Sequence, residues 1–144
     1  MKIISLFSGC GGLDLGFEKA GFEIVFANEF DKNIWATYEK NHTCPLNHND
    51  IRKIDVKEIP DADGIIGGPP CQGFSMAGYR VVEDPRNSLY KEMKEIVNYL
   101  KPDFVVMENV EGLRSMLGGK VEEKIISDYK EIGYEINLTV LNSA

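Results

Sequence analysis

The sequence has no long hydrophobic run, no internal repeat and only three cysteines among its 144 residues. Because a transmembrane helix needs about 18 or more consecutive apolar residues, the chain is not expected to cross a membrane. The apolar stretch at residues 1–7 is too short for the core of a secretory signal peptide. The cysteines form no Cys-x-x-Cys pair, which argues against a disulfide or zinc framework. We therefore expect a cytoplasmic protein in a reducing compartment.

Basic residues are also scarce. The chain has 16 Lys and Arg against 23 Asp and Glu, a formal net charge of −7, which taken alone argues against a phosphate-binding surface. Hydrophobic residues make up 43%, the usual share for a globular protein and more than a disordered chain contains. The length fits one domain and leaves little room for a second.

Short β-branched runs alternate with helical segments along the chain, which is the rhythm of βαβ units in a parallel sheet. We expect strands at residues 2–7, 23–28, 50–54, 64–67, 104–107 and 135–141. We expect helices at residues 13–20, 31–41, 87–100 and 121–132. The pattern predicts a doubly wound α/β fold with a mostly parallel sheet.

A glycine-rich turn joins the first expected strand to the first expected helix. Residues 7–12 read FSGCGG, and glycines at this place let the backbone approach a ligand and point helix amides at it. Asp14 stands where the dinucleotide-binding pattern Gly-x-Gly-x-x-Gly has its last glycine, so the fit to that pattern is imperfect. Glu29 ends the second strand, where a carboxylate accepts hydrogen bonds from ribose hydroxyls. An ordinary tight turn with a surface carboxylate is the alternative, but the two features together favour a nucleoside-bearing cofactor.

The segment before the third expected strand is less informative. If its loop folds back toward Gly9, Asp50 can accept a hydrogen bond from an exocyclic amine such as that of adenine, although a plain turn aspartate explains it nearly as well. His42, Cys44 and His48 are close enough in sequence to hold a metal. We interpret them instead as parts of a polar surface loop and expect no metal site.

The most unusual stretch follows the fourth expected strand. Residues 67–75 read GGPPCQGFS, in which two glycines and two prolines impose a special backbone. Ligands of open α/β sheets bind at the carboxyl ends of the strands, so Cys71 is expected near the cofactor. A cysteine there becomes a nucleophile when nearby N–H groups or a cation favour its thiolate. A free cysteine is more often an inert apolar residue, but that does not explain the prolines and glycines around Cys71.

The fifth expected strand ends in a similar way. Residues 104–107 are apolar and are followed by Glu108 and Asn109, which therefore reach the same edge of the sheet as Cys71. A half-buried carboxylate there can donate a proton or hydrogen-bond to a ring nitrogen. A solvated carboxylate at a strand end is the alternative, and the nearness of Cys71 favours the catalytic interpretation.

In this order and over the whole chain, these residues resemble the motifs of the DNA (cytosine-5) methyltransferases. The most specific part is GPPCQGFS at residues 68–75, which matches the catalytic signature of that family residue for residue, whereas the glycine turn alone is not specific. The other resembling segments are residues 7–12 (FSGCGG), 29–31 (EFD) with Tyr38 and Asn41 downstream, 49–51 (NDI), 84–90 and 108–110 (ENV).

The resemblance implies a Rossmann-like, S-adenosylmethionine-dependent methyltransferase fold, with residues 1–144 as its catalytic and cofactor-binding part. It implies that Glu29 binds the ribose of the cofactor and that Asp50 binds the adenine amine. The residues that it implies for the S-adenosylmethionine site are Phe7, Ser8, Gly9, Gly11, Gly12, Glu29, Phe30, Asp50, Ile51, Pro69 and Leu89.

The resemblance also implies the substrate and the reaction. Cytosine in double-stranded DNA would be flipped out of the stack, because its ring atoms are inaccessible inside a duplex. The Cys71 thiolate would add to C6 while Glu108 contacts the N3 side of the ring, and C5 would take the methyl group before its proton and Cys71 leave. The residues expected to contact DNA are Gln72, Ser75, Arg86 and Asn109.

One part of the family pattern has no counterpart here. Family members are much longer, and downstream they carry an arginine-bearing motif, a target-recognition region and a helix that returns to the cofactor turn. We therefore expect a fold that is incomplete at the C-terminus and a chain that is inactive without a second polypeptide or a C-terminal half. Residues 71–91, which are expected to face DNA, hold more basic than acidic side chains, so the negative charge belongs mostly to the cofactor side. Restriction–modification is one expected setting.

Three alternatives stay open at this point. The first is a tRNA cytosine-5 methyltransferase, against which the continuation GFS at residues 73–75 favours the DNA enzymes. The second is a non-catalytic S-adenosylmethionine-binding module, against which the intact Cys71 and Glu108 argue. The third is a nicotinamide oxidoreductase, which the imperfect glycine pattern and the Pro-Pro-Cys sequence disfavour.

Overall fold

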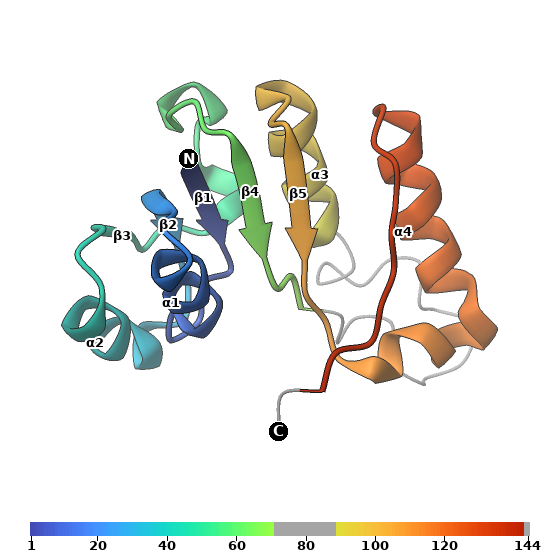
Figure 1. Ribbon diagram of the computed structural model, residues 1–144, viewed down its shortest axis with the longest axis horizontal. Helices are drawn as coiled ribbons and strands as arrows, with labels where there is room; N and C mark the ends of the chain where they lie inside the picture. The colour runs from blue at the N-terminus through green and yellow to red at the C-terminus, as the bar shows by residue number, and fades with distance from the viewer. Residues whose placement is uncertain (71–88, 143–144) are drawn as a thin grey trace.

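A five-stranded parallel sheet forms the centre of the protein, in the order β3-β2-β1-β4-β5 (Figure 1). The computed structural model describes residues 1–70 and 89–142. Each neighbouring pair of strands is parallel. The strands are β1 (Lys2–Leu6), β2 (Glu23–Asn28), β3 (Leu46–Asn47), β4 (Gly64–Gly67) and β5 (Phe104–Met107). The expected α/β fold with a parallel sheet is therefore confirmed.

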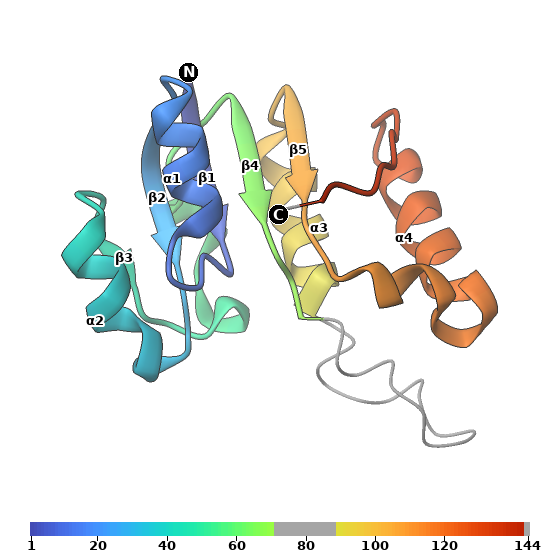
Figure 2. The same ribbon diagram turned by 60° about the horizontal axis from the view of Figure 1, so that its bottom comes forward.

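Helices cover both faces of this sheet. Figure 2 shows α1 in front of β1 and β2, and α3 behind β4 and β5. The α-helices are α1 (Gly12–Lys19), α2 (Lys32–Asn41), α3 (Leu89–Leu100) and α4 (Lys120–Glu131). Shorter 3₁₀ segments are η1 (Ile51–Lys53), η2 (Val56–Glu58) and η6 (Glu111–Gly119). All four predicted α-helices are thus present, within two residues of the expected bounds.

Alternation along β1 divides the hydrophobic core in two. Ile3 and Ser5 point toward α1 and α2, whereas Ile4 and Leu6 point toward α3 and α4. The four side chains are at most 1% exposed, so this strand is buried on both faces as its sequence predicts. The chain reverses its winding beside β1, because β2 lies on one side of that strand and β4 on the other.

The predicted third strand is wrong. Residues 50–54 form no strand: Asp50 caps η1, and its carboxylate accepts a hydrogen bond from the Arg52 backbone N–H at 3.0 Å. The strand that pairs with β2 is the two-residue β3 just before it, in register Ala27↔Leu46. A capping aspartate favours a helical turn over a strand, and this local preference decides the conformation here.

The predicted sixth strand is wrong as well. Residues 135–141 run beside β5 in Figure 1 but form no strand there. Ile136 packs against the core, while Leu138 and Val140 are 45% and 51% exposed. The alternation of apolar residues predicts a strand only where a neighbouring strand completes the hydrogen bonds, and β5 pairs with β4 alone among the described strands. None of the described helices is long and apolar enough to cross a membrane.

Candidate active site

The carboxyl ends of β1 and β4 meet at the point where the winding of the sheet reverses, which is the usual ligand site of such folds. The loop after β1 is the glycine turn, residues 7–12, and the loop after β4 begins with Gly68 and Pro69. A cavity of about 450 Å³ opens between them. Its lining consists of Ser5, Leu6, Phe7, Ser8, Gly9, Gly12, Leu13, Asp14, Gly67, Gly68 and Glu108.

The glycine turn adopts a backbone that is rare for residues with side chains. Phe7 has φ of +54°, Gly9 of +55° and Gly11 of +82°. A left-handed conformation at Phe7 costs on the order of 1 kcal/mol, a strain that persists where surrounding contacts hold it and that is frequent at ligand sites. A Cβ added at Gly9 or Gly12 would meet no atom within 4 Å, so this side of the turn is open to a ligand.

Glu29 lies beside the turn, as predicted. Its Oε2 accepts a hydrogen bond from the Gly9 backbone N–H at 2.9 Å, and its Oε1 accepts one from the Asp31 N–H at 2.7 Å. Each carboxylate oxygen retains a lone pair for a further donor. The next residue, Phe30, is 65% exposed and offers a free aromatic face at the same corner. Trp35 fixes this corner by donating from Nε1 to the Glu29 carbonyl at 2.9 Å.

The loop before Asp50 folds back to the end of β2. The buried Asn28 side chain donates to the backbone carbonyls of Asn47 at 3.0 Å and Asn49 at 2.8 Å, and so holds this loop next to Glu29. Arg52 donates from its backbone N–H and from Nε to the Asp50 carboxylate, and these bonds are the main reason that the pKa of Asp50 lies below its ordinary value. Asp50 is therefore held as an anion.

The end of β5 is joined to the loop after β4. The Glu108 N–H donates to the Gly67 carbonyl at 2.9 Å, and Asn109 Nδ2 donates to the Pro69 carbonyl at 2.8 Å. A Cβ added at Gly68 would lie 3.0 Å from Glu108 Oε2, so glycine at this position lets the carboxylate lie close against the backbone. Glu108 is exposed, not half-buried as expected, and it borders the cavity.

Three residues predicted to bind the cofactor do not line the cavity in the structure. Ile51 is 6% exposed and packs in the core, Pro69 is buried, and Leu89 is half-buried at the start of α3. Their roles toward a cofactor stay predictions. The predicted nucleophile and three of the predicted DNA contacts lie outside the described residues; these are Cys71, Gln72, Ser75 and Arg86.

The interpretation of the residues considered for a metal as parts of a polar surface loop is wrong for His42 and Cys44 but not for His48, which is exposed. His42 and Cys44 are each 9% exposed, and His48 stacks on Trp35 with ring centroids 3.8 Å apart. Within residues 1–70 and 89–142 no cluster of His, Cys, Asp and Glu is arranged to hold a metal.

Sequence reasoning missed a buried polar cluster beneath the turn. Asp14 is fully buried and accepts hydrogen bonds from Ser5 Oγ and from Tyr38 OH, both at 2.7 Å. The only signal was the departure of Asp14 from the glycine of the dinucleotide-binding pattern. The last glycine of that pattern allows close packing of the helix on the strand, whereas Asp14 joins α1 to β1 by accepting a hydrogen bond from Ser5.

Comparison with known proteins identifies the kind of chain that carries this site. The family described as C-5 cytosine-specific DNA methylase matches residues 1–144. The type II methyltransferase M.FnuDI of Fusobacterium nucleatum is 51% identical over 144 residues, which are 99% of this chain and 42% of that protein. M.NgoPII of Neisseria gonorrhoeae, another type II methyltransferase, is 49% identical over 148 residues, 99% of this chain and 43% of that protein.

A solved structure agrees with these relatives. A DNA modification methyltransferase encoded within an Escherichia coli prophage superposes with a TM-score of 0.74 at 34% identity, covering 91% of this chain and 38% of the other. The parallel sheet therefore has the fold of S-adenosylmethionine-dependent methyltransferases. The chain spans about two fifths of the length of the relatives and of the structure that it matches.

Proposed function

This chain belongs to the C-5 cytosine-specific DNA methylase family, and from that premise we propose that it is the cofactor-binding and catalytic part of an enzyme that methylates C5 of cytosine in DNA. The observation that carries the proposal is the cavity between the glycine turn and the Gly68-Pro69 loop, which Glu108 borders. In the sequence, the catalytic signature continues directly from that loop into Cys71.

The residues around the turn fit S-adenosylmethionine. Glu29 has free lone pairs for ribose hydroxyls, Asp50 is an anion beside the same corner, and Phe30 is open to an adenine ring. The open side of Gly9 and Gly12 leaves room for the remainder of the molecule close to the backbone. When bound, S-adenosylmethionine supplies the electrophilic methyl group.

Cys71 and Glu108 then act on the base. C5 of cytosine is a poor nucleophile, and addition of the Cys71 thiolate to C6 makes it enamine-like. Glu108 lies at the end of β5, tied to β4 through the Gly67 carbonyl, and contacts the protonated N3 side of the ring. After methylation the C5 proton passes to a base from solvent, its electron pair restores the C5–C6 double bond, and the Cys71–C6 bond breaks to release the Cys71 thiolate. The base must leave the duplex for this chemistry, so the substrate is flipped DNA.

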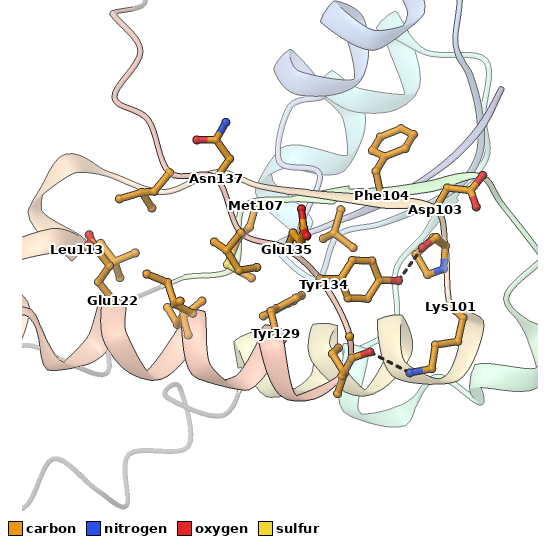
Figure 3. Close-up of a pocket in the computed structure, with 18 residues that line it drawn as sticks. Lys101, Asp103, Phe104, Met107, Leu113, Glu122, Tyr129, Tyr134, Glu135 and Asn137 are labelled. Atoms are coloured by element: carbon orange, nitrogen blue, oxygen red, sulfur yellow. Dashed lines mark hydrogen bonds between the residues drawn. The ribbon is translucent and has the colours of Figure 1, made fainter.

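We also propose that activity requires the portion of chain that the relatives carry beyond the matched part, whether as a continuation or as a second polypeptide. A groove of about 610 Å³ at the free edge of β5 supports this requirement (Figure 3). It lies between β5, α4 and residues 134–138, and its walls include Val105, Met107, Ile125 and Ile136. Parallel sheets are normally covered, so an open edge with these apolar side chains in its walls favours further chain alongside it.

A second open surface lies on α1. Gly12, Gly16 and Ala20 line a shallow groove of about 240 Å³ with Leu13, Phe17 and Phe22. A Cβ at Gly12 or Gly16 would meet no atom within 4 Å. Small residues at helical spacing allow the close approach of another helix, as expected for the helix that returns to the cofactor turn in the family.

The test is methyl transfer from labelled S-adenosylmethionine to duplex DNA. The purified chain is assayed alone and after co-expression with the part of M.FnuDI that lies beyond the matched region; tRNA serves as the competing substrate. We expect label in DNA only in the combined protein. Strong labelling of DNA by the chain alone would contradict the proposal that activity requires a second portion. Preferential labelling of tRNA would contradict the proposal that DNA is the substrate.

The nucleophile is tested with duplex DNA containing 5-fluorocytosine, from which the C5 substituent cannot leave. The combined protein is expected to form a covalent adduct that Cys71→Ser abolishes and Cys44→Ser, a buried cysteine in another part of the chain, retains. An adduct that survives in Cys71→Ser would place the nucleophile elsewhere.

A further inference from the structure

His42 lies against the inner side of the glycine turn. A Cβ built on Gly11 would come within 2.0 Å of His42 Nε2 and within 2.8 Å of two ring carbons. The imidazole thus occupies the space that a side chain at Gly11 would need. The contrast with Gly9 and Gly12 is complete, because their Cβ positions are open. The turn therefore has one side for a ligand and one side filled by a histidine.

The imidazole itself is held from two directions. Its Nδ1 lies 3.1 Å from Glu18 Oε2, and its ring stacks on Tyr38 with centroids 4.4 Å apart. The His42 side chain is only 2% exposed; its Nδ1–H donates to the acceptor-only Glu18 carboxylate, and its Nε2 faces Gly11. Glu18 lies on the last turn of α1, so His42 ties the end of α2 to both ends of α1.

Tyr38 extends this contact to β1. Its hydroxyl donates to Asp14 Oδ2, and Ser5 Oγ donates to Asp14 Oδ1, both at 2.7 Å. The four elements that surround the turn, β1, α1, α2 and the loop after α2, are therefore connected through one buried cluster: Ser5, Asp14, Glu18, Tyr38 and His42. We call this set the turn-support cluster.

We propose that His42 is a positioning residue for the cofactor site: it holds the glycine turn in its ligand-binding conformation by packing under Gly11. This inference rests on the proposed function, because it assumes that the open side of the turn receives S-adenosylmethionine. Within the turn, Phe7 has a positive φ, a conformation strained for a residue with a side chain that must be held by its surroundings, and Gly9 and Gly11 follow it at positive φ. Loss of the ring leaves a cavity under Gly11 into which the backbone can relax.

The first measurement does not depend on any ligand. Amide hydrogen exchange is followed in the 144-residue chain for Gly9 and Gly11, whose N–H groups donate to Glu29 Oε2 and to the Ser8 carbonyl. We expect His42→Ala to speed exchange at both amides by about tenfold relative to the mean of the β4 amides. Val121→Ala, a buried apolar truncation on α4, is the control that lowers stability without reaching the turn. Unchanged exchange in His42→Ala would overturn the proposal.

The second measurement is the dissociation constant of S-adenosylhomocysteine by titration calorimetry. His42→Ala is expected to weaken binding by about tenfold through lost preorganisation, with Val121→Ala within about twofold of the parent. Glu18→Gln keeps an acceptor for Nδ1–H and is expected to bind like the parent, whereas Glu18→Ala is expected to fall between the parent and His42→Ala. Equal affinities for the parent and His42→Ala would overturn the proposal.

Gly11→Ala provides the third arm. In the parent, the methyl group that this substitution adds meets the His42 imidazole, whereas in His42→Ala it enters the vacated space. Gly11→Ala should therefore reduce the affinity for S-adenosylhomocysteine less in His42→Ala than in the parent. An identical effect in both backgrounds would contradict a direct contact role. If the parent chain binds no S-adenosylhomocysteine while the exchange result holds, the cofactor assignment fails and the support of the turn by His42 stands.

Discussion

Three tyrosine hydroxyls in this chain have different surroundings, and replacing each tyrosine with phenylalanine should change the free energy of unfolding by a different amount. Tyr38 OH donates to the fully buried Asp14 carboxylate at 2.7 Å. Tyr134 OH donates to the neutral Pro102 carbonyl at 2.6 Å (Figure 3). Tyr129 OH is buried and has no hydrogen-bond partner among the described residues. Replacing each with Phe removes one oxygen and leaves the ring in place.

The expected magnitudes follow from the partner that each hydroxyl leaves behind. Tyr38→Phe leaves the buried Asp14 carboxylate with one donor. We expect the free energy of unfolding to fall by about 2–3 kcal/mol, because hydrogen bonds to charged groups are stronger than those to neutral groups. Tyr134→Phe should cost about 1 kcal/mol. Tyr129→Phe removes a desolvated hydroxyl that gains nothing in return, so it should stabilise the fold by up to about 1 kcal/mol.

Urea unfolding at pH 7 measures the series, followed by far-UV circular dichroism and by the fluorescence of Trp35, the one tryptophan in the sequence. For a domain of this size, the loss in Tyr38→Phe corresponds to a fall in Tm of about 6–9 °C. The slope of the free energy against urea should stay unchanged, since no variant alters the surface exposed on unfolding. A loss in Tyr38→Phe no larger than that in Tyr134→Phe would refute the importance of the buried carboxylate.

Three further predictions concern the site and the sheet. Glu29→Gln should weaken S-adenosylhomocysteine binding by about tenfold in calorimetry, because the weaker amide acceptor replaces the carboxylate at the ribose position; equal affinity would contradict that role. Arg52 lowers the pKa of Asp50 in the folded protein, so the Asp50 carboxylate should stabilise the fold above its unfolded pKa of about 3.9. The difference in unfolding free energy between the parent and Asp50→Asn should therefore be constant from about pH 5 to about 8. It should vanish as the pH falls through the folded pKa of Asp50. Gly67→Ala should lower the free energy of unfolding by about 3 kcal/mol, because its Cβ would lie 2.5 Å from a β1 carbonyl oxygen. The control Gly16→Ala should raise it by up to about 1 kcal/mol through helix propensity. Equal unfolding free energies for the two variants would contradict this prediction.

The elements that sequence reasoning located correctly are those with local signals. The apolar residues of β1, the glycines after it and the capping Asp31 of α2 each determine their own conformation. Asp31 accepts a hydrogen bond from the Asn33 N–H, as its place before the helix predicts. In the same way, the ends of β4 and β5 were located by their four-residue apolar or glycine-bounded runs.

Apart from the wrong strand at residues 50–54, which has a local cause in the capping Asp50, the errors come from contacts between distant segments. Residues 135–141 alternate like a strand, but no local pattern reveals whether a neighbouring strand is present. The hydrogen bond from Tyr38 to Asp14 joins residues that are 24 positions apart in the sequence, and no periodic pattern in the sequence predicts it. The prediction of His42 as a surface residue is wrong because its ring packs under Gly11, stacks on Tyr38 and lies beside Glu18, contacts that no local sequence pattern reveals.

The two sides of the site differ in how complete they are. Glu29 and the Asp50 loop belong to the part of the sheet near β1 and β2, which the turn-support cluster and the Asn28 hydrogen bonds hold from within. The β5 side carries Glu108 beside a strand whose outer edge faces the groove between β5, α4 and residues 134–138. Under the proposed function, cofactor binding should therefore depend on contacts within the described part of this chain, whereas the geometry of the proposed base-reacting groups should depend on what packs against β5. For this reason we assign the cofactor site to these 144 residues and the control of catalysis to the surface that covers that edge.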